Sequence, residues 1–391
     1  MTFTPRSGAV VLALGSTLGA GVLTGFAPAV AGAGPWFLPA LVVAALAALC
    51  SAMSTADQHQ VYPEGTGATR VRAQFGLLPS WIAASAHVVG RAGVVAAVAS
   101  AFAVHVLPQY RVPVAAALVV LAVALGGVAW PARLTPVAVA FVVGVLVLVA
   151  VVCLAVPPPA NPASALRPDV MGVLGGACVL FAAFTGFERV TSPGRDERAF
   201  DPRALKVAVP VLFAVLLALY ALVGHAVLRQ LGPDRLALSK APLRDALVVA
   251  DGRWLVPLLA VGAAVAAVSV LRSALVGARR TLGSVTSVRG RLPLDVVNGA
   301  LAVAAVVVLQ PATALAVGGC ATAVYYGFTN AAARLLAKED RTWPARTACF
   351  GLGLSVVLAV GAPTDALVVT GVGLVVGTAA LALGRPRAHS R

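Results

Sequence analysis

Charge is scarce in this amino-acid sequence, and negative charge is the scarcest. Charged residues make up 11% of the 391 residues, with 14 Asp and Glu against 29 Lys and Arg. Because a soluble domain carries about 25% charged residues, this composition excludes an ordinary soluble protein. Hydrophobic residues make up 60% of the chain, and the mean hydropathy is +0.95. These values are typical of an all-α integral membrane protein with several transmembrane helices.

Several functional motifs are also missing. The five cysteines form no Cys-x-x-Cys pair and the histidines are scattered, so we expect neither a disulfide framework nor a metal site. The absence of a Walker loop excludes ATP as the direct energy source. The apolar stretches lack the alternation typical of transmembrane β-strands. We expect no cofactor.

Apolar segments follow one another along the whole chain. About twelve of them approach the roughly 20 residues that cross a bilayer as a helix. They are 7–31, 35–56, 80–107, 112–130, 134–156, 169–191, 205–231, 253–280, 293–309, 311–335, 344–361 and 363–384. We predict one transporter domain over 1–391, with five helices in 1–156, five in 169–335 and two more in 344–384.

The net charge of +15 indicates topology rather than nucleic-acid binding. The cations fall mainly in short loops between apolar segments, and most lie on one side if the N-terminus is placed inside. This bias predicts a multi-pass protein of the cytoplasmic membrane with both termini in the cytoplasm. The expected partners are therefore the lipid bilayer and a small-molecule substrate, and the sequence leaves the oligomeric state open.

Two of the apolar segments are interrupted. Glycine-rich residues 15–21 break the first segment, and residues 184–188 break the sixth. Hydrocarbon tolerates unpaired backbone only where protein or a cavity shields it, so a break marks a place where main-chain groups meet a ligand. Breaks at matching positions of two halves indicate a five-plus-five inverted repeat with discontinuous helices 1 and 6. The alternative is a kink with close helix packing.

Four motifs, taken in order, resemble one known family. They are Gly15-Ser16-Thr17-Leu18-Gly19-Ala20-Gly21, Ala31-Gly32-Ala33-Gly34-Pro35, Phe181-Ala182-Ala183-Phe184-Thr185-Gly186-Phe187-Glu188, and Asp196-Glu197 followed by Asp201-Pro202-Arg203. Together they resemble the amino acid permeases of the amino acid–polyamine–organocation superfamily. The resemblance implies a carrier for amino acids. The polar stretch 189–198 and the segment 62–67 depart from the family pattern at the inner gate.

An amino acid substrate predicts a particular kind of site. Free N–H groups at a half-helix start suit a carboxylate, and free C=O groups at a half-helix end suit an ammonium. We expect the first break to hold the carboxylate through Ser16, Thr17, Gly19, Ala20 and Gly21. We expect the second break to contact the amine and side chain through Ala182, Ala183 and Thr185, with Phe181, Phe184 or Phe187 closing over the ligand.

Four ionisable residues within the spans are candidates for coupling or gating. Glu188 either binds a proton or caps the inner half-helix. Arg91 lies deep in the third span, where an unpaired charge is costly, and Glu188 is its nearest acidic candidate. His87 precedes Arg91 by one turn, so the pair either responds to pH or is simply buried. Arg272 either joins this site or extends toward the inner surface.

The sequence thus predicts a secondary active transporter that moves neutral, aliphatic amino acids by alternating access. H⁺ and Na⁺ both remain open as coupling ions, since Ser269 and Ser273 fit either Na⁺ ligation or ordinary packing. The loop Arg195–Arg198 is either an inner gate or solvated. The alternatives are a carrier of another small organic amine or cation, an intramembrane enzyme and a non-transporting sensor. We do not expect an enzyme.

Overall fold

The computed structural model describes residues 5–126, 134–159, 166–167, 169–194, 199–288 and 290–384. Over these residues the secondary structure consists of helices, with no β-strand. The prediction of an all-α protein is therefore confirmed for the described chain.

The α-helices follow one another with short connections. Their bounds are α1 (Pro5–Thr17), α2 (Ala20–Thr24), α3 (Phe26–Ala33), α4 (Phe37–Val61), α5 (Gly67–Phe75), α6 (Leu77–Val106), α7 (Arg111–Leu125), α8 (Leu134–Ala155), α9 (Val170–Ala183), α10 (Glu188–Thr191), α11 (Pro202–Leu238), α12 (Pro242–Val249), α13 (Val256–Val285), α14 (Arg291–Val308), α15 (Pro311–Ala333), α16 (Ala345–Val360) and α17 (Thr364–Leu383). Three 3₁₀ turns lie between them, namely η1 (Gly34–Trp36), η2 (Pro108–Tyr110) and η3 (Arg253–Leu255).

Short polar side chains define two of the helix starts. Asp169 precedes α9 and accepts a hydrogen bond from the Gly172 N–H at 2.6 Å. Asp201 precedes α11 and accepts one from the Arg203 N–H at 2.9 Å, with Pro202 at the first helical position. These caps satisfy N–H groups that have no partner inside the helix. The Asp-Pro-Arg motif is thus the start of α11.

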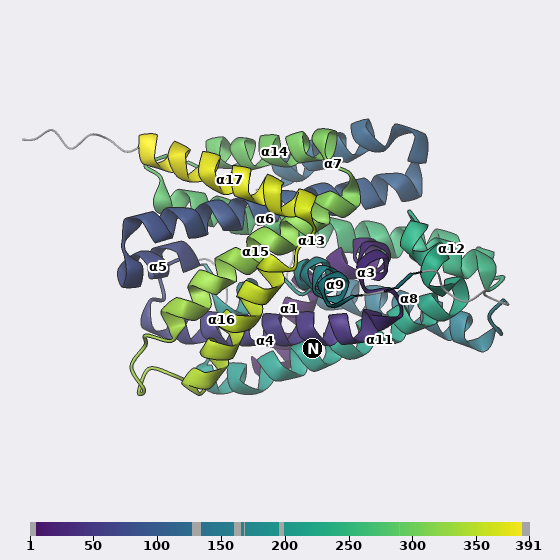
Figure 1. Ribbon diagram of the computed structural model, residues 1–391, viewed down its shortest axis with the longest axis horizontal. Helices are drawn as coiled ribbons and strands as arrows, with labels where there is room; N and C mark the ends of the chain where they lie inside the picture. Colours follow the sequence, from purple (N-terminus) through teal and green to yellow (C-terminus); the bar gives the residue numbers. More distant parts are fainter. Residues whose placement is uncertain are drawn as a thin grey trace, which may run out of the picture.

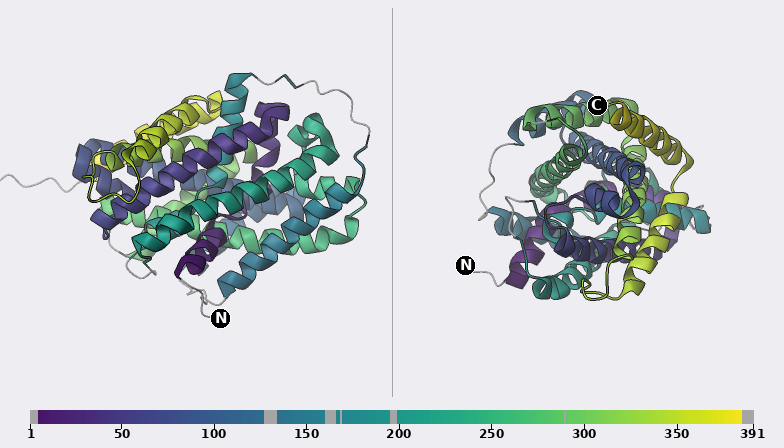
Figure 2. Two further views of the ribbon diagram at one scale, coloured as in Figure 1. Left: turned by 90° about the horizontal axis from the view of Figure 1, so that it is seen from below. Right: turned by 90° about the vertical axis from the view of Figure 1, so that its left-hand side faces the viewer.

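Helix α6 is deeply buried within the bundle. It packs against α5, α7, α13, α14, α15 and α17, and these helices lie around it in Figures 1 and 2. Of its most apolar stretch 78% is buried, against 11% in α7 and in α17. Helices α7 and α17 therefore present most of their apolar side chains outward, as expected of helices that face lipid.

Small residues let α6 and α15 approach backbone to backbone. A Cβ added at Gly93 would lie 2.6 Å from the Ala314 carbonyl oxygen and 2.8 Å from the Gly318 nitrogen. A Cβ added at Gly90 would lie 2.6 Å from Thr322 Oγ1. Such contacts replace the hydrophobic effect as the source of helix association within a bilayer.

Helices occupy every one of the predicted apolar segments within the described residues. In the described part of the chain, eight helical stretches are long and apolar enough to cross a membrane, and α9 and α16 are shorter apolar helices. The multi-pass helical architecture is therefore established. The number of twelve crossings stays a prediction.

The close contact between α6 and α15 leads to a stability prediction. We expect Gly93→Ala to lower the stability by about 1–3 kcal/mol, because the new methyl group overpacks against the α15 backbone. Gly371→Ala is the matched control, since Gly371 is exposed on α17 and has no atom within 4 Å of the added Cβ. Thermal unfolding of both variants in detergent is the measurement. Equal unfolding midpoints for Gly93→Ala and Gly371→Ala would contradict the close packing of α6 on α15.

Candidate functional site

The first helix break separates α1 from α2. Helix α1 ends at Thr17 and α2 begins at Ala20, so Leu18 and Gly19 lie between two helices inside one predicted segment. Gly19 has a φ of 130°, which residues with a Cβ rarely adopt. A Cβ at this position would also lie 2.8 Å from the Ala266 Cβ on α13. The break therefore needs glycine for its conformation and for its packing.

The second helix break separates α9 from α10. Residues 184–187 form a turn between Ala183, the last residue of α9, and Glu188, the first residue of α10. Gly186 within this turn has a φ of 126°. A Cβ on Gly186 would lie 2.5 Å from the Ser16 carbonyl oxygen at the end of α1. Both predicted interruptions thus exist, and they lie against each other.

Hydroxyl groups pair the main-chain oxygens at the two breaks. Ser16 Oγ lies 2.9 Å from both the Gly186 and the Ala13 carbonyl oxygens, so its single proton is shared between the second break and its own helix. The hydroxyl of Tyr220, which is fully buried on α11, lies 3.3 Å from both the Thr17 and the Ala183 carbonyl oxygens. Helix ends leave such carbonyls without partners inside the helix. Tyr220 therefore joins the ends of α1 and α9.

A buried ion pair lies directly after the second break. Glu188 Oε2 accepts from Arg91 at 2.8 Å and lies 3.1 Å from His87 Nε2, while Oε1 accepts from the Tyr326 hydroxyl at 2.9 Å. His87 Nδ1 lies 2.8 Å from the Thr281 hydroxyl. The predicted pairing of Arg91 with Glu188 is confirmed. The network connects α10 to α6, α13 and α15 near the middle of α6.

A second buried arginine holds the loop after α4. Arg70 on α5 is 1% exposed and donates to the Gly65 carbonyl at 2.7 Å and to Ser192 Oγ at 2.9 Å. It also lies 2.9 Å from His59 Nδ1. Burial lowers the pKa of Arg70 to about 10, so the side chain stays charged at neutral pH. Arg70 thereby fastens the chain after α10 to α4 and α5.

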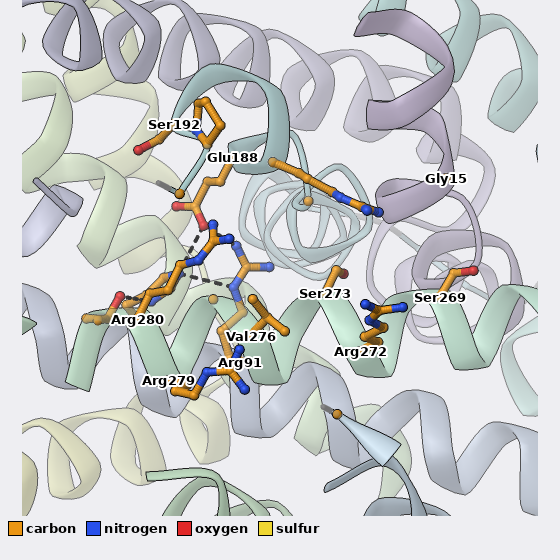
Figure 3. A pocket seen from close by; sticks show the side chains of 18 of the residues that line it. Gly15, Arg91, Glu188, Ser192, Ser269, Arg272, Ser273, Val276, Arg279 and Arg280 are labelled. Carbon is orange, nitrogen blue, oxygen red and sulfur yellow. Dashed lines mark hydrogen bonds and ion pairs between the residues drawn. The ribbon is translucent and has the colours of Figure 1, made fainter. Parts of the chain in front are cut away.

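A cavity of about 820 Å³ reaches the two breaks from one end of the bundle (Figure 3). Its inner end is lined by Gly15 near the end of α1, Leu18 of the first break and Gly186 of the second break. Its outer part is lined by Thr66 and Arg291. The Arg291 side chain is 42% exposed, so this end opens toward solvent. One face of α13 runs along the cavity and carries Ser269, Arg272, Ser273, Val276, Arg279 and Arg280.

The predicted site residues divide into two groups. His87, Arg91, Glu188 and Arg272 line the cavity. The predicted substrate contacts are packed beneath it, and the ten that the structure describes fully are not among its lining residues; they are Ser16, Thr17, Gly19, Gly21, Phe181, Ala182, Ala183, Phe184, Thr185 and Phe187. The side chain of Ala20 and the residues 195–198, including Asp196-Glu197, lie outside the described part of the chain.

The three phenylalanines belong to an aromatic cluster behind the breaks. All three are fully buried. Phe184 packs on Tyr220 with ring centroids 5.2 Å apart, and Phe187 packs on Tyr326 at the same separation. Phe181 contacts the Tyr326 ring edge to face at 5.9 Å. In the observed conformation these rings therefore close the side of the site away from the cavity.

Comparison with known proteins assigns the chain to a family. Residues 8–296 match the family model described as amino acid permease. The chain belongs to the amino acid permease family. This permease is also 35% identical to proteins named as uncharacterized transporters in Mycobacterium bovis and Mycobacterium tuberculosis, over 96% of its own length and 90% of theirs. The resemblance based on the sequence motifs is confirmed, and the protein is a transporter.

Solved structures share the fold of the permease. Two mutants of a manganese transporter from Eremococcus coleocola cover 97% of this chain and 92% of their own, with TM-scores of 0.59 and 0.60. Their sequence identity to the permease is 14%. At this identity the similarity establishes the helical transporter fold alone.

Sequence reasoning missed Tyr220 and Arg70. A tyrosine in an apolar span was a usable signal for Tyr220, because a buried hydroxyl needs a hydrogen-bond partner. Arg70 gave no such signal, since it lies in a polar connection where a solvated arginine is ordinary. Both residues owe their role to contacts between segments distant in sequence.

Removal of the Tyr220 hydroxyl tests the link between the two breaks. We expect Tyr220→Phe to lower the stability by about 1–3 kcal/mol, because two buried carbonyls lose their shared donor. Tyr110→Phe is the control, since Tyr110 is 57% exposed. Thermal unfolding in detergent is the measurement, and a Tyr220→Phe midpoint as high as that of the control would rule out the link.

The buried ion pair is best tested by a double-mutant cycle. We expect Glu188→Gln to cost about 3–5 kcal/mol of stability, because it leaves Arg91 charged and buried without a carboxylate. Combining it with Arg91→Gln should restore part of the loss. Glu339→Gln, at an exposed position, should leave the unfolding midpoint unchanged. Strictly additive losses from the two single variants would contradict the pairing.

Proposed function

We propose that this permease moves amino acids across the cytoplasmic membrane as a secondary active carrier. The observation that carries the proposal is the contact between two broken helices at the closed end of a cavity, with Ser16 against Gly186. A site at a helix break binds a zwitterion through main-chain groups and needs few ionisable side chains. The amino acid permease family supports the substrate class.

We further propose twelve crossings in a five-plus-five inverted repeat, with both termini in the cytoplasm. The breaks after α1 and α9 lie in the first membrane-spanning segment of each proposed half. Helices α16 and α17 are additions to the two halves. The cavity opens where Arg279, Arg280 and Arg291 lie, on the side that the charge bias places inside the cell. The observed conformation would then be the inward-facing state of an alternating-access cycle.

In this proposal the predicted substrate contacts act when the breaks separate. Ser16, Thr17 and Thr185 hydroxyls now donate to carbonyls of the two helix ends. The ammonium group of the substrate would replace these donors, and the carboxylate of the substrate would lie against the N–H groups at the start of α2. Glu188, which holds α10 to α6 through Arg91, would act as the gating residue.

Transport by the reconstituted protein tests the proposal. Proteoliposomes should accumulate at least one labelled amino acid, with imposed H⁺ and Na⁺ gradients varied separately to identify the coupling ion. Gly19→Ala should reduce this uptake about tenfold or more, because the added Cβ strains a positive φ and collides with α13.

Gly76→Ala is the matched control for Gly19→Ala. Gly76 also has a positive φ, of 83°, but no atom lies within 4 Å of its added Cβ. Amino acid uptake by the Gly76→Ala variant should stay near the wild-type level. Full transport by Gly19→Ala would overturn the proposed site, and the absence of any amino acid uptake by the wild type would overturn the proposed function.

A further inference from the structure

His87 is a buried histidine whose two ring nitrogens meet polar groups of other helices. On one side Nδ1 lies 2.8 Å from the Thr281 hydroxyl on α13, and on the other Nε2 lies 3.1 Å from Glu188 Oε2 on α10. His87 also lines the cavity. The histidines of the described chain that do not line it are His59, His105 and His225. Histidine is the side chain that gains and loses a proton near neutral pH.

Arg91 fixes which nitrogen of the neutral His87 ring carries the hydrogen. The Arg91 Nε–H points at His87 Nε2 over 3.2 Å, and an arginine donates hydrogen bonds without accepting them. His87 Nε2 therefore presents a lone pair, and the ring hydrogen lies on Nδ1, where it is donated to Thr281. Arg91 also donates from Nη2 to Glu188 Oε2 at 2.8 Å (Figure 3). One guanidinium group thus bridges two hydrogen-bond acceptors.

The two acceptors bridged by Arg91 lie within hydrogen-bonding distance of each other. His87 Nε2 and Glu188 Oε2 are 3.1 Å apart, and with a neutral ring neither atom donates to the other. A proton on Nε2 converts this contact into a charge-assisted hydrogen bond from an imidazolium to a carboxylate. The Arg91 Nε–H then loses its acceptor. The proton therefore changes which side chains hold α10 to α6.

Other ionisable groups face this pair from the neighbouring helices. On α15 the Tyr326 hydroxyl donates to Glu188 Oε1 at 2.9 Å, and the Tyr325 ring packs on the His87 ring with centroids 4.5 Å apart. Arg70 on α5 binds Ser192, the residue after α10. Further charged side chains in the cavity lining are Glu64, Arg189, Arg272, Arg279, Arg280 and Arg291. Within the described chain, Glu188 is the acidic side chain in hydrogen-bonding contact with His87, so its carboxylate stabilises an imidazolium there.

A proton bound at this pair acts close to the proposed substrate site. His87, Arg91 and Glu188 all line the cavity, whose other end opens toward solvent at Arg291. Glu188 is the first residue of α10, directly after the second break. Gain or loss of the proton therefore changes the hydrogen bonds that hold the half-helix beside the proposed substrate.

We propose that H⁺ is the coupling ion of the permease, and that the coupling proton binds between His87 Nε2 and Glu188 Oε2. This inference rests on the proposed function, because it names the ion that drives the same carrier. One proton from water binds the Nε2 lone pair in the outward-facing state and leaves to the cytoplasm through the cavity. The ring keeps its Nδ1 hydrogen throughout, so His87 alternates between imidazole and imidazolium. With a zwitterionic amino acid, each cycle then carries one positive charge inward.

Uptake driven by a proton gradient is the first test. Proteoliposomes without Na⁺ receive a mixture of labelled amino acids, with the outside more acidic than the inside. One proton per amino acid supports up to about tenfold accumulation per pH unit, so wild-type accumulation should rise steeply with the gradient. His87→Gln should lower this response to about twofold or less, because an amide still donates to Glu188 but takes up no proton. Exchange of labelled for unlabelled amino acid should persist in His87→Gln, since it needs no net proton movement.

A matched control and a spectroscopic readout complete the design. His105→Gln should keep the wild-type response, because His105 lies on the same helix but outside the cavity, with Nδ1 2.8 Å from the Ala101 carbonyl oxygen. Nitrogen NMR spectra of histidine-labelled protein in detergent need no flux, and the His87 signals are assigned by their loss in His87→Gln. They should show the Nδ1–H form at alkaline pH and conversion to imidazolium on acidification to about pH 5.

The outcomes separate this inference from the proposed function. Accumulation that follows a Na⁺ gradient and ignores pH would overturn the proton as the coupling ion and leave the carrier function standing. A proton-gradient response that survives His87→Gln would overturn the site. If His87→Gln exchanges no amino acid, conversion of the wild-type His87 signals would support the site, and signals that do not change with pH would overturn it. A wild type that transports no amino acid would overturn the proposed function and this inference together.

Discussion

The structure depends on the pairing of main-chain groups that two broken helices expose inside a membrane protein. Hydrocarbon offers no hydrogen bonds, so each free carbonyl or N–H group costs several kcal/mol unless protein or water meets it. Here the carbonyls of Thr17 and Ala183 share the Tyr220 hydroxyl, and that of Gly186 accepts from Ser16. Breaks that would be unstable alone stabilise each other by lying together.

The same constraint governs the charged side chains. Arg91 is buried at the centre of α6, and Glu188 compensates it at 2.8 Å with help from Tyr326. Arg272 differs from Arg91 in its surroundings, since it is half-buried and lines a cavity that opens to solvent. One arginine therefore fastens α10 to the bundle, whereas the other faces the cavity. Two residues of one type thus differ in burial and in access to solvent.

Small residues make this arrangement compact. Glycines on α6 and α15 bring the two backbones into contact, and Gly21 brings α2 against Ala183 at the end of α9. A Cβ at Gly21 would lie 2.5 Å from the Ala183 Cβ and 3.0 Å from the Tyr220 ring. The glycines at the breaks therefore do more than loosen a helix. They allow the two helix ends and the bridging tyrosine to approach.

The sequence by itself determined the helical class, the positions of both breaks and the resemblance to the family, and it offered Glu188 as the nearest acidic candidate for Arg91. These follow from apolar length, glycine placement and the rarity of acids within the spans, which are local or compositional properties. Only the tertiary structure decided which residues face the cavity. The predicted contacts Ser16, Thr17, Gly19, Gly21, Phe181–Thr185 and Phe187 are covered by neighbouring helices, whereas Arg272 lines the cavity. Which face of a helix is covered depends on partners distant in sequence, and no local pattern encodes that choice.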